Sequence, residues 1–116
     1  MPASIMLGRA DLASATGVTA ITATTTAAAT ATALTGMVNI VTTASGDTAV
    51  KLPQNLAAGS PLIVASHAST VACLVYPPTT AGKINNTTAS FSVAQNKPVV
   101  FYSHPNGIDY TAVLSA

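Results

Sequence analysis

The sequence has 116 residues, which is enough for one domain, and only 6% of them are charged, against roughly 25% in an ordinary soluble domain. Four scattered basic residues cannot form the cationic footprint of a nucleic-acid-binding protein, and so few titratable groups argue against acid–base catalysis. A hydrophobic content of 49% excludes a disordered chain. The composition indicates a folded, non-catalytic domain without cofactors, and its nearly neutral surface suits a subunit of an assembly.

Residues 1–17 mix apolar and charged side chains without a helical or strand period. Ile5, Met6 and Leu7 stand close to Arg9, and Gly17 closes the segment. We expect an N-terminal arm at residues 1–17 that becomes ordered by lying on another surface, followed by a single β-domain at residues 18–116. A charge inside the apolar start argues against a secretory signal, so we expect synthesis and assembly in the cytoplasm.

The Ala- and Thr-rich stretch after the arm carries no charge, yet it predicts no membrane span. Residues 22–33 contain no Leu, Ile, Val, Phe or Met, and threonine contributes little insertion energy. Ala favours helix, but the frequent Thr and the missing apolar stripe favour strand or extended chain. We therefore expect no contact with a membrane.

From residue 18 onward, short apolar or alternating runs are separated by turn residues, which predicts strands throughout. The turn at residues 44–47 suits a hairpin between two of them. The apolar runs at 62–66 and 70–76 predict strands covered on both faces. We expect eight or nine strands among the following candidate segments: residues 18–24, 30–35, 37–43, 48–52, 62–66, 70–76, 83–85, 89–94, 98–103 and 108–114.

These short strands, at roughly 8–12-residue spacing, predict an all-β fold: a small antiparallel β-sandwich or jelly-roll-like barrel of about eight strands. The core of so small a domain is modest, so we expect oligomerisation to cover exposed strand edges. The expected core residues are Ile40, Leu52, Ile63, Val64, Val75, Phe91, Val100 and Phe101.

Few side chains offer chemistry. His67, His104 and Asp109 are the types that form a facial metal triad, but they do not cluster in the sequence as the ligands of metal-binding cupins do. We therefore predict neither a metal site nor catalytic residues. Cys73 lies in an apolar run without a neighbouring cation, which predicts a buried, inert thiol.

An alternative for the Thr-rich stretch is ice binding, in which rows of Thr on a flat β-face organise water. Thr22, Thr24 and Thr26 have the even spacing that such a row needs, and so do Thr30 and Thr32. The row occurs once and then loses its period, whereas ice-binding proteins repeat it through many coils.

The order of features in the second half resembles the capsid decoration, or cement, proteins of tailed bacteriophages. The segments that carry this resemblance are GDTAVKLP at 46–53, AGS at 58–60, LIVAS at 62–66, VYP at 75–77, GKIN at 82–85 and VVFY at 99–102. The Thr- and Ala-rich stretch before them is also typical of these proteins, so that the similarity spans most of residues 18–114.

The resemblance implies a non-enzymatic virion subunit, often a homotrimer, that binds the outer capsid surface and clamps neighbouring major capsid proteins. It brings no contact residues with it. The apolar arm suggests the docking segment, and we expect Ile5, Met6, Leu7 and Arg9 to contact the capsid. The same turn and strand signatures occur in phage tail, fibre and receptor-binding modules, which form the alternative function.

Overall fold

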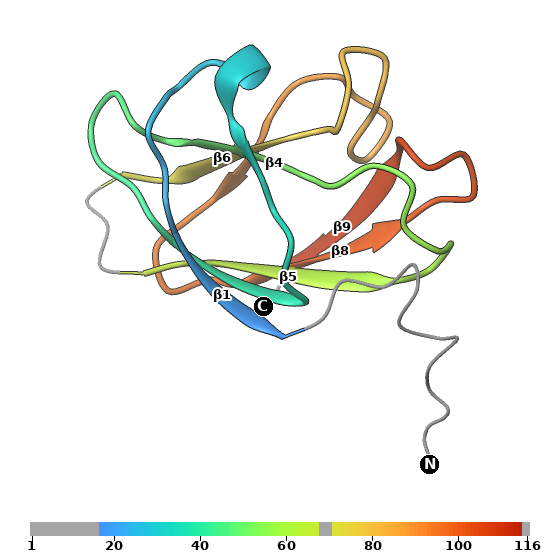
Figure 1. Ribbon diagram of the computed structural model, residues 1–116, viewed down its shortest axis with the longest axis horizontal. Coiled ribbons are helices and arrows are strands. Elements are labelled where there is room, and N and C mark those ends of the chain that lie inside the picture. Colours follow the sequence, from blue (N-terminus) through green and yellow to red (C-terminus); the bar gives the residue numbers. More distant parts are fainter. Residues whose placement is uncertain (1–16, 68–70, 115–116) are drawn as a thin grey trace.

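The structure is a computed structural model that describes residues 17–67 and 71–114. In these residues nine strands form two sheets, which lie as two layers in Figure 1. The larger sheet has the order β1-β3-β5-β8-β9 and the smaller one the order β2-β4-β6-β7. The larger sheet consists of β1 (Val18–Thr22), β3 (Val38–Thr42), β5 (Pro61–Ser66), β8 (Val99–Ser103) and β9 (Tyr110–Leu114). The smaller sheet consists of β2 (Thr32–Ala33), β4 (Ala49–Lys51), β6 (Cys73–Tyr76) and β7 (Phe91–Val93). The expected all-β class is confirmed.

The chain alternates between the sheets, and this corrects the expected antiparallel pairing. Strands β1, β3 and β5 enter the larger sheet in turn, and β2, β4 and β6 enter the smaller sheet between them. Because each connection crosses to the opposite sheet, the next strand of the same sheet arrives in the same direction. The pairs β1–β3, β3–β5, β2–β4 and β4–β6 are therefore parallel. Only β5–β8, β6–β7 and β8–β9 are antiparallel, which makes both sheets mixed.

The turn at residues 44–47 forms as predicted, but it does not make the expected hairpin. Ala44 and Asp47 exchange backbone hydrogen bonds of 3.1 and 2.9 Å, so a tight turn forms as predicted. The flanking strands β3 and β4 lie in different sheets, however, and the turn is a corner of the winding instead of a hairpin. The Ala- and Thr-rich connection from β1 to β2 contains one 3-10 turn, η2 (Ala28–Thr30), whose flanking residues Ala27 and Ala31 are extended.

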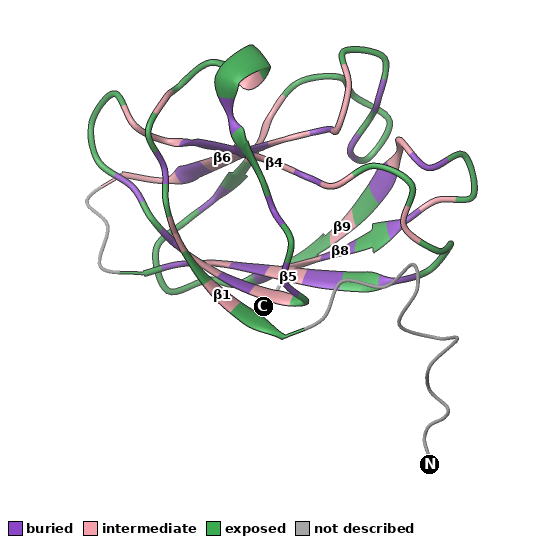
Figure 2. Ribbon diagram, viewed as in Figure 1, coloured by how far each residue is buried: buried purple, intermediate pink, exposed green. Residues whose placement is uncertain are grey.

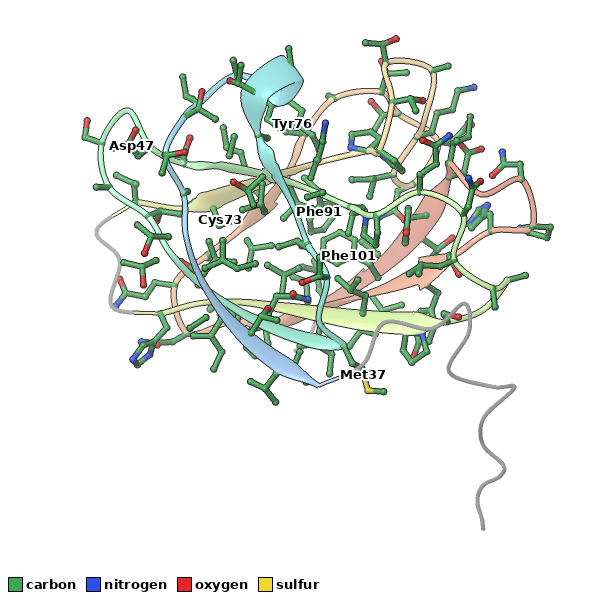
Figure 3. The ribbon with its side chains drawn as sticks, viewed as in Figure 1. Met37, Asp47, Cys73, Tyr76, Phe91 and Phe101 are labelled. Carbon is green, nitrogen blue, oxygen red and sulfur yellow. The ribbon has the colours of Figure 1, made fainter. Side chains whose placement is uncertain are left out.

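The core lies between the two sheets, where buried residues alternate with exposed ones along the strands (Figure 2). Phe91 of the smaller sheet meets Phe101 of the larger one edge to face, with ring centroids 5.6 Å apart, and Figure 3 shows both rings between the layers. Three expected core residues, Ile40, Ile63 and Val100, are only half-buried and alternate with buried neighbours, so they lie on the outer face of the larger sheet. The strands are apolar on both faces, and sequence alone could not distinguish the two.

One buried amide holds the parallel part of the larger sheet together. The side chain of Asn39 in β3 is fully buried. Its Oδ1 accepts hydrogen bonds from the Thr19 hydroxyl in β1 (2.8 Å) and from the Gly36 N–H (3.1 Å). Its Nδ2 donates to the carbonyl oxygens of Gly36 (2.8 Å) and of Ile63 in β5 (3.2 Å). All four hydrogen-bonding positions of the amide are thus used, and one side chain joins three strands.

Gly36 is required for this arrangement. A Cβ at Gly36 would lie 2.9 Å from the Thr19 methyl group and 3.0 Å from its hydroxyl, so any larger residue would push β1 away from the turn.

A small hairpin with a polar turn lies at the expected strand 83–85, where the backbones of Ile84 and Thr87 bond to each other across Asn85 and Asn86. Both asparagines have positive φ, as a two-residue turn of this kind needs.

We expect Asn39→Leu to lower the free energy of unfolding by about 2–4 kcal/mol, because donors and acceptors on β1, on β5 and at Gly36 lose their partners. Urea denaturation of the full chain measures this loss. Gln54→Ala, at an exposed loop position, is the control and is expected to change stability by less than about 0.5 kcal/mol. A loss for Asn39→Leu no larger than that of the control would contradict the proposed role of the amide.

Candidate interaction surface

The outer face of the larger sheet is the most unusual surface of the described chain. Residues that point away from the core alternate with buried ones on each of its five strands. None of these outward residues carries a charge: they are Val18, Ala20, Thr22, Val38, Ile40, Thr42, Pro61, Ile63, Ala65, Val100, Tyr102, Thr111 and Val113. We call this set the outer face.

Strand register arranges part of the outer face as a straight line. Val18 pairs with Val38, Val38 with Ile63, Ile63 with Val100 and Val100 with Val113. These five side chains, which we call the aliphatic row, cross the whole sheet at right angles to the strands. Val18 is 67% exposed and Val113 49% exposed, while the three between them are half-buried. Met37, 41% exposed, extends the apolar surface beside the start of β3, and Figure 3 shows its side chain pointing away from the sheet.

A shallow depression lies next to the aliphatic row. It has a volume of about 310 Å³ and is lined by Ile40, Ala65, Ser66, His67, Asn96 and Pro98. Ile40 and Ala65 pair with each other across β3 and β5, and Ala20 continues their row on β1. The outer face thus offers uncharged, largely apolar rows and a hollow, which is the character of a surface that packs against another protein element.

A second hollow lies between η2 and the loop after β6. This groove of about 440 Å³ is lined by small and apolar residues, including Ala28, Ala29, Tyr76, Pro77 and Pro78, with Lys51 as the one charged residue of its lining. Nothing in this lining selects one class of ligand over another.

The residues considered for metal binding are not brought together. His67 follows β5 and His104 follows β8, and because these strands are antiparallel the two rings lie at opposite ends of the sheet. His104 Nε2 is 2.6 Å from the Thr111 hydroxyl, and Asp109 accepts a hydrogen bond from the Lys83 N–H. Within residues 17–67 and 71–114, no three His, Cys, Asp or Glu side chains gather as a metal site would require.

The threonines considered for ice binding do not form one flat face. Thr22 lies in β1, Thr30 in η2 and Thr32 in β2, which belongs to the other sheet. Hydroxyl pairs in this region join neighbouring loops instead: Thr25 with Thr30 at 2.9 Å, and Thr26 with Thr48 at 3.0 Å. These two hydroxyl pairs therefore lie in the connections between the sheets.

The residues proposed for the docking arm, Ile5, Met6, Leu7 and Arg9, lie outside the described residues. The outer face was missed in the sequence because its Ile40, Ile63 and Val100 were assigned to the core. The available signal was the surplus of apolar residues on both faces of the strands.

In the described part of the chain, no helix is long and apolar enough to cross a membrane.

Two buried ionisable groups lie in the core. Burial raises the pKa of the Cys73 thiol from 9.0 to about 12, and it raises the pKa of the Tyr110 phenol from 10.0 to about 12. The Tyr110 hydroxyl donates a hydrogen bond of 2.6 Å to the Pro53 carbonyl oxygen. Cys73 is fully buried, so the expectation of a buried thiol is confirmed.

These raised pKa values predict a loss of stability in alkali. Well below pH 9 both groups are protonated in the folded and unfolded states, and their titration does not affect stability. Between about pH 9 and pH 12 the unfolded chain loses protons that the folded chain retains, so stability falls as pH rises. The urea midpoint of the wild-type chain should decline from pH 8.5 to 11 more steeply than that of Cys73→Ala. Parallel declines would contradict the contribution of the thiol.

Comparison of the chain with protein-family models, with curated proteins and with solved structures gave no match.

Proposed function

We propose that the protein is a capsid decoration protein of a tailed bacteriophage. It would bind the outer surface of the capsid and reinforce contacts between major capsid proteins. The observation that carries the proposal is the uncharged outer face, with the aliphatic row across all five strands of the larger sheet. A surface of this kind is typical of protein packing, and the sequence resemblance to decoration proteins supplies the identity of the assembly.

The low charge of the whole chain supports a role inside an assembly. With a formal net charge of +1 and only 6% charged residues, copies repel one another weakly and can crowd onto one shell. Many weak apolar contacts, repeated over many copies, stabilise a shell without any strong single site. A reinforcing clamp needs such contacts and needs no catalysis.

The arm would provide the contact with the major capsid protein. Ile5, Met6 and Leu7 offer apolar surface and Arg9 a single cation, and a segment that becomes ordered on binding can follow the contour of its partner. The protein would be assembled in the host cytoplasm and located on the capsid surface of the virion. Neither nucleic acid nor membrane takes part in this function.

We infer that the two facing sheets are a variant of the β-sandwich or jelly-roll-like subunit that the resemblance implies. In this variant the first six strands wind in parallel between the layers, and antiparallel strands complete both sheets. Support comes from the shared core between the sheets, in which Phe91 and Phe101 meet.

Removal of residues 1–12 is expected to abolish binding to capsids while leaving the β-domain folded. Co-sedimentation of the full chain and of the truncated chain with bare capsids measures the first effect, and circular dichroism with urea denaturation measures the second. Unchanged co-sedimentation of the folded truncated chain would contradict the role of the arm. Binding of the full chain to host cells and not to capsids would support the tail, fibre or receptor-binding alternative.

The free chain is expected to be a homotrimer, because threefold association would cover strand edges that are unpaired in the described residues, such as those of β1 and β2. Light scattering after gel filtration should give three times the mass of 11.5 kDa, and the value should persist on dilution. A monomer at all concentrations would contradict this part of the proposal.

A further inference from the structure

The outer face of the larger sheet presents apolar side chains that no described residue covers. The strands β3, β5 and β8 carry apolar residues on both faces, as strands buried on both sides do. Their inner faces form the core, whereas Ile40, Ile63 and Val100 point outward. We propose that, in the free chain, residues 6–12 of the same chain lie extended across the aliphatic row and cover it.

The length of this segment matches the row. Four strand spacings of about 4.8 Å separate Val18 on β1 from Val113 on β9, or about 19 Å in all. Residues 6–12 in extended conformation span six steps of about 3.4 Å, or about 20 Å. A segment that begins over β1 at Leu12 therefore ends over β9 at Met6.

The pattern of charge in the segment selects one side for the sheet. Side chains alternate between two sides of an extended chain. Met6, Gly8, Ala10 and Leu12 fall on one side, which is uncharged, and both Arg9 and Asp11 fall on the other. The uncharged side fits the uncharged outer face, and the two charged groups stay in water, which avoids the cost of burying them.

The point where the described chain begins favours this path. Val18 is both the first residue of β1 and the first member of the aliphatic row. Gly17 is anchored there, since its carbonyl oxygen accepts hydrogen bonds from the N–H groups of Met37 (2.9 Å) and Val38 (3.1 Å). Its φ of +77° belongs to the left-handed region, which allows the chain to change direction. Residues 13–17 leave about 20 Å of chain for the return to the row.

The same chain is a better occupant than a second copy. The row with its flanking residues covers roughly 19 by 16 Å, on the order of 300 Å², whereas a stable dimer buries about 800 Å² on each partner. A tethered segment also acts at an effective concentration in the millimolar range. At micromolar protein the tethered segment therefore has an advantage of about a thousandfold over another copy.

This inference concerns the free chain and does not rest on the proposed function. In an arm placed this way, Ile5, Leu7 and Arg9 face outward from the sheet. Its test uses the purified chain alone, whereas the proposed function is tested with capsids, so failure of one is distinguishable from failure of the other.

Disulfide trapping in the full chain tests the placement. Met6→Cys combined with Val113→Cys places thiols where the segment should end over β9. The control combines Met6→Cys with Ser92→Cys, an exposed position on β7 of the other sheet. Buried Cys73 is left in place. We expect an intramolecular disulfide to form about tenfold or more faster in the first pair. Equal rates in the two pairs would overturn the proposal. Disulfides formed between molecules would also overturn it, because they would show that the segment lies on a neighbouring copy.

A matched pair of substitutions provides a second test that does not depend on thiols. Leu12→Asp places a charge on the side that faces the sheet, and Leu7→Asp places the same charge on the side that faces water. We expect a several-fold rise in the fluorescence of an apolar dye such as ANS with Leu12→Asp, because the aliphatic row becomes exposed, and no rise with Leu7→Asp. Equal dye binding by the two variants would overturn the proposal.

Discussion

The buried amide of Asn39 is the interaction on which the parallel part of the structure depends. Parallel strands cannot be joined by a tight hairpin, so the alignment of β1, β3 and β5 needs another determinant. Asn39 provides one by bonding Thr19 in β1, the turn at Gly36 and the Ile63 carbonyl of β5 at the same time. Any slip of one strand by a residue would leave part of this buried amide unpaired, at a cost comparable to a large share of a small domain's stability.

The alignment fixed by Asn39 also determines the outer surface. The register that pairs Asn39 with Thr19 and Val64 places Val18, Val38 and Ile63 in line on the opposite side of the strands. Antiparallel pairing with β8 and β9 then continues the line through Val100 to Val113. One strand register therefore arranges both the core face and the outer face of the larger sheet. A change that disturbs the Asn39 amide would also disturb the aliphatic row.

The sequence predicted the strands better than it predicted their partners. The expected strands at 37–43, 62–66 and 98–103 differ by only one residue at their ends from β3, β5 and β8. Alternation and turn residues mark where a strand begins and ends, but they do not show whether the next connection stays in one sheet or crosses to another. The turn at Ala44–Asp47 has hairpin chemistry and nevertheless joins two sheets.

The assignment of Ile40, Ile63 and Val100 to the core had a similar cause. Hydrophobicity identifies a side chain that avoids water, not the element that will cover it, and here the described residues leave one apolar face open. Asn39 carried a usable signal, since it is the only polar side chain between Met37 and Val41. A lone amide inside an apolar strand has to be either exposed or fully hydrogen-bonded. Its partners lie 20 and 24 residues away, a distance over which a single sequence carries no pairing information.

The alternation of the first six strands between two sheets has a consequence for how the chain folds. None of the strands β1 to β5 pairs with its immediate successor, so each pairing among the first five strands has to close a loop that holds another strand. In the second half, β6–β7 and β8–β9 are pairs of consecutive strands, and the latter are joined by the short connection 104–109. Local pairs form before distant ones because loop closure costs less entropy. We therefore expect β8 and β9 to pair early in folding and the parallel pairs of the N-terminal strands to form later.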